Sequence, residues 1–337
     1  MVLAIFETNM NHLKKNMATM TGDDYYPQLI FRNKHFNTAY RTLFYRFEIN
    51  YKRKRVVTTD NDFLDLDFAI VNSDKIVILL HGLEGSSDSN YIKSLTKVLN
   101  DQNFDVVVLN FRGCSGEPNM LLESYHSGKT DDLKEVISYL ETEHSYNEIN
   151  IVGFSLGGNI ALKYLGECGT KVPGILKTTV TISVPCDLKG SSEALGRFSN
   201  KPYMMRFLRT LKKKAFDKLA KFPDSPLIIE NIKKAQNFND FDDAFTAPAH
   251  GFKNAFDYWD KSSSKQFIPD IKLPTLLITS MDDPFLSKSC FPVAEAKANP
   301  YFNLDLKKYG GHVGFNTEFG IKNDLWLENR IAEFIKN

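Results

Sequence analysis

Short, continuous apolar runs recur along this chain, and they constrain its fold more than any other feature. Runs without strict polar–apolar alternation are expected to be buried on both faces, like strands of a mostly parallel sheet that helices cover. The expected strands are KIVILL (75–80), DVVVLN (105–110), INIV (149–152), TTVTISV (178–184), TLLITS (275–280) and NLDLKKY (303–309). Helical periodicity near residues 90–102, 130–144, 156–167, 286–298 and 321–336 would supply the crossovers. This alternation predicts the α/β class.

The remaining segments suggest how the domain is organised. Residues 56–71 hold two β-rich runs around the turn TDND, which predicts a hairpin. Residues 187–272 are helical in pattern and lie between two expected strands, so we expect a helical cap over the carboxyl edge of the sheet, where open α/β sheets bind ligands. The chain is then one domain over residues 27–337, preceded by a disordered extension over residues 1–26.

Composition limits the classes of function. Hydrophobic residues make up 42% and charged residues 25% of the 337 residues, as in soluble globular proteins, and a net charge of +1 offers no global field for nucleic acid. No apolar run approaches the roughly 20 residues that span a bilayer, and the opening MVLAIF is too short for a signal peptide. The four cysteines lack zinc-site or disulfide-framework spacing, so we expect free thiols in the cytoplasm.

A G-x-S-x-G pattern at residues 153–157 stands between an expected strand and an expected helix. This is the context of a nucleophile elbow, in which a serine occupies a tight, strained turn from strand to helix. Gly153 and Gly157 remove side chains that would collide with neighbouring backbone in such a turn. The following helix directs its first N–H groups towards developing negative charge. Ser155 is therefore the predicted nucleophile.

A serine nucleophile needs a base and a third group that orients the base. Around this type of elbow the partners follow in the order serine, acid, histidine. Asp282 and Asp283 follow the strand at 275–280; the spacing and the proline at 284 favour Asp283, and Asp282 stays open as the alternative. His312 lies in the glycine-rich segment after the last expected strand. The predicted catalytic residues are Ser155, Asp283 and His312, with no metal or cofactor.

An acyl-transfer site also needs donors for the oxyanion of the tetrahedral intermediate. The backbone N–H groups of Leu156, next to the serine, and of Leu83, in the loop after residue 80, are the candidates. His81 in the same loop is expected to shape it rather than act as a base. The segment HGLEGSS lacks the Gly-Lys-Ser/Thr ending of a phosphate loop and any G-x-G-x-x-G, which disfavours a nucleotide site.

Long and uncommon segments of the chain resemble one branch of a known superfamily. They are HGLEGSSDSNY (81–91), NFRGCSGEPN (110–119), YHSGKTDDL (125–133), VGFSLGGNIALKYLGE (152–167), FDDAFTAPAHGF (241–252), MDDPF (281–285) and GGHVGF (310–315), with NKHFNT (33–38) and DNDFLDLDF (60–68) as amino-terminal signatures. Together they are similar to the YheT-type branch of the α/β-hydrolase superfamily, which contains esterases and lipase-like hydrolases.

The resemblance implies an α/β-hydrolase fold with a mostly parallel central sheet flanked by helices. It implies a triad of Ser155, an aspartate at 282 or 283, and His312, acting on small-molecule esters or lipids with medium to long acyl chains. Hydrolysis is the favoured activity, and transfer of the acyl group to an alcohol is the alternative. A non-catalytic binding protein is disfavoured because no catalytic position is lost.

Three further features lie outside the predicted triad and oxyanion hole. Cys114 follows a strand that leads into a long loop, so it is expected to be structural rather than a nucleophile. Arg112, Glu117 and His126 form, as a hypothesis, a polar wall beside the site. Residues 201–222 predict a basic amphipathic helix, whose favoured role is to pack on the core as part of the cap. The alternative is peripheral contact with an anionic lipid surface. The oligomeric state is not indicated.

Overall fold

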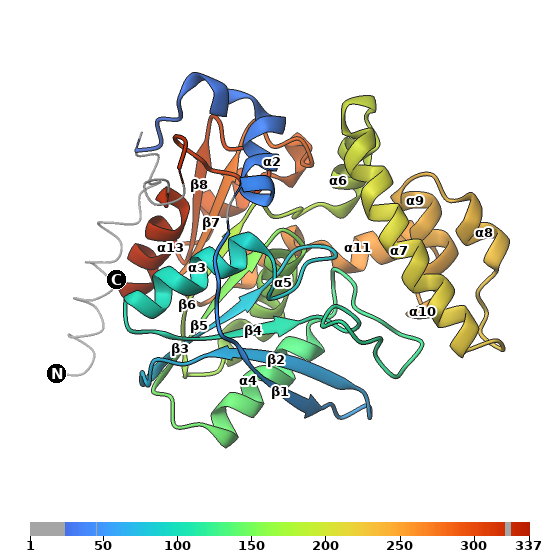
Figure 1. Ribbon diagram of the computed structural model, residues 1–337, viewed down its shortest axis with the longest axis horizontal. Helices are drawn as coiled ribbons and strands as arrows, with labels where there is room; N and C mark the ends of the chain where they lie inside the picture. The colour runs from blue at the N-terminus through green and yellow to red at the C-terminus, as the bar shows by residue number, and fades with distance from the viewer. Residues whose placement is uncertain (1–23, 45, 321–324) are drawn as a thin grey trace.

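The computed structural model describes residues 24–44, 46–320 and 325–337, and an eight-stranded sheet forms its centre (Figure 1). The strand order is β1-β2-β4-β3-β5-β6-β7-β8, in which β2 runs antiparallel to both neighbours and the other pairs are parallel. The strands are β1 (Lys52–Val57), β2 (Phe63–Ala69), β3 (Lys75–Leu80), β4 (Asp105–Asn110), β5 (Glu148–Phe154), β6 (Leu176–Ile182), β7 (Thr275–Ser280) and β8 (Phe302–Lys307). The predicted mostly parallel sheet is confirmed.

Helices cover both faces of this sheet (Figure 1). Helices α3 (Asn90–Asp101) and α13 (Trp326–Lys336) pack on one face, and α4 (Asp131–Glu143) and α5 (Leu156–Cys168) pack on the other. Alternate residues of β3 belong to different layers, because Ile76 and Ile78 join the core beneath α4 and α5, whereas Val77 and Leu79 join the core beneath α3. This double burial is why the strands read as continuous apolar runs.

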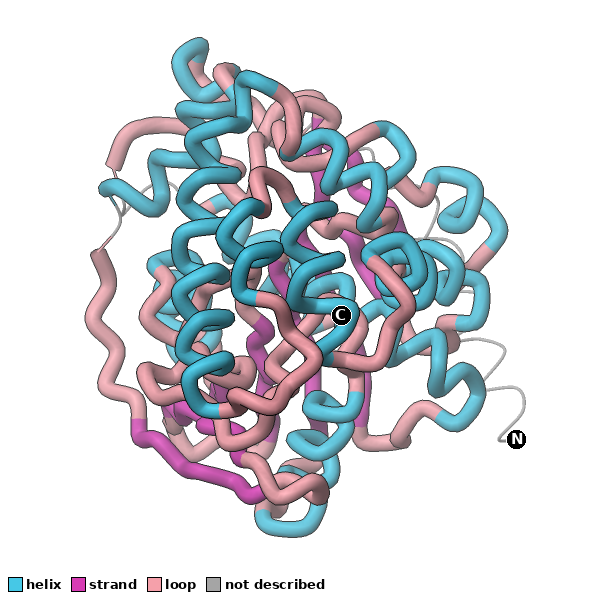
Figure 2. Tube along the Cα trace, turned by 90° about the vertical axis from the view of Figure 1, so that its right-hand side faces the viewer, coloured by secondary structure: helices cyan, strands magenta, loops and turns pink. Residues whose placement is uncertain are grey.

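A helical segment is inserted between β6 and β7. Residues 183–274 are all described and contain no strand. The insertion holds α6 (Leu188–Leu195), α7 (Lys201–Lys221), α8 (Ile229–Lys234), α9 (Phe238–Phe241), α10 (Ala247–Ala249) and α11 (Ala255–Ser262). In the side view of Figure 2 its helices lie in front of the strands. Ser191 and Asn200 donate hydrogen bonds to the carbonyls of Phe285 and Pro284, just beyond β7, so the insertion contacts the carboxyl edge of the sheet.

Two elements differ from the expectations. The first strand of the hairpin begins at Lys52 rather than Val56, because the guanidinium groups of Arg53 and Arg55 pair with the buried Asp67 and Asp65 across the β1–β2 ladder. The helix expected over 286–298 is a 3₁₀ turn followed by the short helix α12 (Val293–Ala298). Pro292 explains the break, because a proline lacks a backbone N–H and disfavours helical geometry in the residue before it.

The amino-terminal boundary also differs. Residues 1–23 of the expected disordered extension lie outside the described residues. Tyr25, within the expected extension, is buried, packs against Phe315 and Trp326, and donates a hydrogen bond to the carbonyl of Asn316. The packed domain therefore includes at least one residue before the predicted start at 27. In the described ranges no helix combines the length and hydropathy needed to cross a bilayer.

The buried Asp242 side chain makes the stability of the inserted segment sensitive to pH. It accepts hydrogen bonds from Trp259 Nε1 at 2.8 Å and Thr246 Oγ1 at 2.6 Å, and burial raises its pKa from 3.8 to about 7. Because the folded protein binds this proton more tightly than the unfolded chain, the stabilisation is complete below about pH 4 and is lost as pH rises through about 7.

We expect Asp242→Asn, a neutral replacement of the same shape, to reduce the decline in Tm between pH 5 and pH 8 and to raise Tm at pH 8. Thermal unfolding across this pH range tests the prediction, with the exposed Asp217→Asn as control. A variant whose Tm falls with pH as steeply as that of the wild type would contradict it.

Candidate active site

Ser155 lies alone between the end of β5 and the start of α5. Its φ of 51° and ψ of −116° place it in a strained region that non-glycine residues seldom adopt. A Cβ on Gly153 would come within 2.6 Å of the carbonyl oxygen of Gly157, and a Cβ on Gly157 would come within 2.5 Å of that of Leu80. These glycines therefore permit the tight turn, as the sequence predicted, and the turn presents the serine at the carboxyl edge of the sheet.

The three predicted side chains meet at this edge. His312 Nε2 lies 2.9 Å from Ser155 Oγ, and His312 Nδ1 lies 2.9 Å from Asp283 Oδ2 and 3.2 Å from Asp283 Oδ1. Asp283 is only 4% exposed, and its Oδ1 also accepts the N–H of Phe285 at 2.8 Å. Residues from the ends of β5, β7 and β8 thus form one continuous hydrogen-bonded chain.

Asp282, the alternative acid, points to backbone instead. Its Oδ1 accepts the N–H of Gly311 at 3.0 Å, and burial raises the pKa of its carboxyl group. The carboxylate therefore ties the end of β7 to the loop that carries His312. Geometry favours Asp283 as the partner of the imidazole and gives Asp282 a supporting contact in the same loop.

The loop after β3 passes beside the serine. A Cβ on Gly82 would lie 3.4 Å from Ser155 Cβ. The residues on either side of Leu83 use their backbone N–H groups within the fold. The N–H of Gly82 donates to Tyr91 Oη, and the N–H of Glu84 donates to Tyr125 Oη. Leu156 is the first residue of α5, and first-turn N–H groups lack an acceptor within the helix. Both predicted oxyanion donors therefore lie in segments that flank Ser155.

The neutral ring of His81 holds this loop through hydrogen bonds to backbone groups. Its Nε2 accepts the N–H of Phe111 at 3.1 Å, so its Nδ1 carries the proton and donates to the carbonyl of Gly82 at 2.7 Å. Burial lowers the pKa of His81 to about 4, which keeps the ring neutral at physiological pH. Both ring nitrogens are used within the fold, in agreement with the expected loop-shaping role.

Helix α2 (Lys34–Phe44) supports the histidine loop, a contribution that sequence reasoning missed. Thr38 Oγ1 accepts the N–H of His312 at 2.8 Å, Asn37 Oδ1 accepts the N–H of Asn316 at 3.0 Å, and Arg41 Nε donates to the carbonyl of Gly314. The loop needs such support, because Val313 has a φ of 59°. The NKHFNT signature was the available signal, but it did not reveal a partner 274 residues away.

Replacing Thr38 by valine removes the acceptor for the N–H of His312 without changing side-chain shape. We expect kcat for ester hydrolysis to fall about tenfold, because a small displacement of the imidazole weakens its alignment with Ser155. Thr38→Ser should restore most of the rate, and Thr42→Val, at an exposed position of α2, should leave it unchanged. A Thr38→Val enzyme with wild-type kcat would refute this support.

Comparison with known proteins places this chain in a family. A profile of the alpha/beta hydrolase fold matches residues 75–290. The chain is 33% identical to the YheT protein of Escherichia coli over 319 residues, which cover 93% of each chain. The chain belongs to the YheT-type branch of the α/β-hydrolase family. This α/β hydrolase is also 32% identical to the medium-chain fatty acid ethyl ester synthase/esterase 2 of Saccharomyces cerevisiae, over 77% of its own length and 61% of the relative's.

Structural similarity agrees with this assignment of the fold. The hydrolase matches the esterase Pf2001 of Pyrococcus furiosus with a TM-score of 0.57 at 20% identity, covering 86% of this chain and 91% of the other. The sequence relatives of the hydrolase include esterases and lipases, which supports hydrolysis of carboxylic esters as its general activity.

Other candidate residues of the hydrolase have contacts outside the chain of Ser155, His312 and Asp283. Cys114 is a free thiol whose pKa burial raises to about 11, which leaves little thiolate. The hypothesis of a polar wall stays a prediction: Arg112 is buried in ion pairs with Asp132 and Asp60, and Glu117 is exposed beside Arg55. The third member, His126, stacks edge-on against His250 and Phe252. Each of the three residues therefore has partners within the fold.

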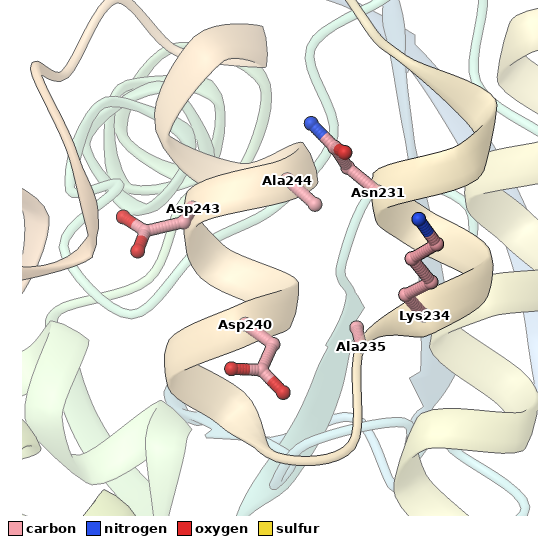
Figure 3. A pocket seen from close by; sticks show the side chains of 6 residues that line it. All are labelled: Asn231, Lys234, Ala235, Asp240, Asp243 and Ala244. Atoms are coloured by element: carbon pink, nitrogen blue, oxygen red, sulfur yellow. The ribbon is translucent and has the colours of Figure 1, made fainter.

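A cavity of about 340 Å³ lies between α8 and the helical segment of residues 238–246, which comprises α9 and the turn that follows it (Figure 3). Asn231 and Lys234 line one side, and Asp240 and Asp243 line the other. Both carboxylates already accept backbone N–H groups, Asp240 from Gln236 and Asp243 from Ala255. None of the predicted catalytic residues lines this cavity, and we assign it no part in catalysis.

Proposed function

We propose that this α/β hydrolase is a serine esterase that forms an acyl-enzyme on Ser155. The observation that carries the proposal is the continuous chain from Ser155 Oγ through the His312 ring to the buried Asp283. A serine hydroxyl becomes an effective nucleophile when a positioned base accepts its proton. The strained turn and the glycines around it support the same role for Ser155.

In the proposed reaction Ser155 Oγ attacks the ester carbonyl while His312 Nε2 accepts the hydroxyl proton. Asp283 orients the ring and stabilises the imidazolium, which then donates the proton to the leaving alcohol. The N–H groups of Leu83 and Leu156 would stabilise the oxyanion. Water activated by His312 then cleaves the acyl-enzyme and releases the carboxylic acid.

We propose esters with medium to long acyl chains as substrates. The yeast relative named for medium-chain ethyl esters supports this choice, and its name covers both synthesis and hydrolysis. Transfer of the acyl group to an alcohol therefore remains the second candidate activity. It differs from hydrolysis only in which hydroxyl attacks the acyl-enzyme. A purely binding role is disfavoured, because the three side chains lie in reactive geometry.

A series of p-nitrophenyl esters of increasing acyl length, assayed with and without ethanol, tests these assignments. We expect kcat/KM to rise from acetyl to medium-chain esters, with the free acid as the main product. Ethyl ester formed in the presence of ethanol would establish acyl transfer as well. Highest activity on the acetyl ester would contradict the proposed acyl-chain preference.

We also propose that a lipid surface can contact the amino-terminal half of α7 and the turn before it. Two lysines in the carboxyl-terminal half bind within the protein: Lys218 and Lys221 donate to carbonyls in residues 119–121. By contrast, Phe198 is 89% exposed and Met205 is 62% exposed. The exposed cations around them are Arg197, Lys201, Arg206 and Arg209. Exposed apolar side chains among cations favour an anionic membrane surface.

Co-sedimentation with vesicles tests the surface at residues 197–209. We expect binding to phosphatidylserine-containing vesicles at low salt, weaker binding to phosphatidylcholine vesicles, and loss of binding in the double variant Phe198→Ser, Met205→Ser. Val57→Ser removes another exposed apolar side chain, on β1, and should bind like the wild type. Absence of wild-type binding to the anionic vesicles would remove the proposal.

A further inference from the structure

Lys214, on helix α7 of the inserted segment, reaches the loop that carries one proposed oxyanion donor. Its Nζ lies 2.7 Å from Glu84 Oε1, and Glu84 directly follows Leu83. The Glu84 side chain is 9% exposed and that of Lys214 is 36% exposed, so water only partly screens the pair. This ion pair joins two segments that are 130 residues apart in the chain.

Glu84 is held on its backbone and on its side chain at once. Tyr125 Oη accepts the N–H of Glu84 at 2.9 Å and donates to Glu84 Oε1 at 2.7 Å. Glu84 itself has a φ of 56°, a conformation that costs energy for a residue with a side chain. Because this strained backbone adjoins Leu83, a displacement of Glu84 would be passed through the backbone of Leu83 to the Leu83 N–H.

The surroundings of Lys214 leave Glu84 as its charged partner. The nearby Cys114 Sγ lies 3.3 Å from the ammonium, but burial raises the pKa of this thiol, which therefore stays neutral. The ammonium also lies 5.5 Å from the centre of the Tyr125 ring, a cation–π contact. The ion pair, the phenol and the thiol together form a small, closed set of contacts around Glu84.

Helix α7 is fixed to the body of the protein one and two turns beyond this point. Lys218 donates to the carbonyls of Asn119 and Leu121, and Lys221 donates to that of Met120. Asp62 holds the same segment from the other side by accepting the N–H groups of Met120 and Leu121. These contacts set the position of α7, and that position in turn places Lys214 against Glu84.

From these contacts we infer that Lys214 is a positioning residue for the oxyanion hole. The Lys214–Glu84 pair holds the Leu83 N–H in its productive direction when the inserted helices are seated, so the position of α7 is coupled to transition-state stabilisation. This inference rests on the proposed esterase function. It adds a residue that affects the rate without belonging to the chain of Ser155, His312 and Asp283. Lys214 does not touch the reacting atoms and acts through Glu84.

Lys214→Met tests the inference, because methionine keeps an unbranched apolar stem and removes the charge. We expect kcat to fall about tenfold with KM changed less than about twofold, since the affected interaction forms only in the transition state. Binding of a trifluoromethyl ketone, whose adduct with the serine carries an oxyanion, should weaken by the same factor. An ether of the same chain length, in which CH₂–O replaces the ketone carbonyl, cannot form an oxyanion. Its binding should not change. Lys214→Arg should recover part of the rate.

Lys213→Met is the matched control, because Lys213 is exposed and pairs only with Asp217 on the same helix among its described contacts. It should behave as the wild type. If Lys214→Met does not fold, Glu84→Gln tests the same pair. If the two residues are coupled, kcat of the double variant Lys214→Met, Glu84→Gln should fall no further than kcat of either single variant. Wild-type kcat, or a rise in KM with unchanged ketone binding, would overturn the inference.

Failure of this inference can be separated from failure of the proposed function. A fluorophosphonate reports on the nucleophile, so wild type and Lys214→Met should both be labelled on Ser155, the variant more slowly. Labelling of both proteins at equal rates would overturn the role of Lys214 and leave the esterase proposal intact. Absence of labelling in the folded wild type would overturn both.

Discussion

Replacing Ser155 by alanine is expected to lower kcat for p-nitrophenyl esters by about a millionfold. Without Oγ no acyl-enzyme can form, and His312 loses the hydroxyl from which it would accept a proton. The fold should persist, because alanine and serine adopt the strained φ of 51° at similar cost. Steady-state kinetics and thermal unfolding of the variant measure both expectations.

The matched control for this variant is Ser192→Ala on α6, which should keep wild-type kinetics. Substrate binding should survive in Ser155→Ala, and a non-hydrolysable ester analogue can measure it. A folded Ser155→Ala protein that retains more than about a hundredth of the wild-type kcat would place the nucleophile elsewhere.

Asp283→Asn is expected to have the second-largest effect, a fall in kcat of about ten thousandfold. The buried carboxylate fixes the ring so that Nδ1 carries the proton and Nε2 faces Ser155 Oγ. Asparagine can present its amide N–H to Nδ1 instead, which favours the tautomer with a protonated Nε2. That ring cannot accept the serine proton, so the loss falls mainly on kcat.

The neighbouring carboxylate provides a sharp comparison. Asp282→Asn keeps an oxygen that can accept the N–H of Gly311, so we expect kcat to fall no more than about tenfold. Assaying both variants on one ester decides between the two aspartates that the sequence left open. Equal losses, or a larger loss in Asp282→Asn, would contradict the assignment of Asp283.

Local patterns were sufficient to predict the sheet and the serine turn. The strand ending at Phe154, the glycines around Ser155 and the helix from Leu156 are adjacent in sequence, so a single segment specifies the elbow. The order of the other two candidates followed from chain topology, because parallel strands end at the same edge. The structure brings Asp283 and His312 together at that edge.

Contacts between distant segments could not be predicted in this way. Thr38 meets His312 across 274 residues, and Lys214 meets Glu84 across 130 residues, so neither pair leaves a local pattern. The charged residues before Val56 hid the start of β1, because Arg53 reads as a solvent-exposed residue until its partner Asp67 is placed on β2. Ion pairing across strands and helices is a property of the folded chain.

The most direct test of the central claim is covalent labelling of the nucleophile. A fluorophosphonate should add one probe mass to the folded wild type, and peptide mapping should place the adduct on Ser155. Ser155→Ala should remain unmodified, and Asp283→Asn should react far more slowly. A folded wild-type protein that resists the probe, or an adduct on any residue other than Ser155, would contradict the account.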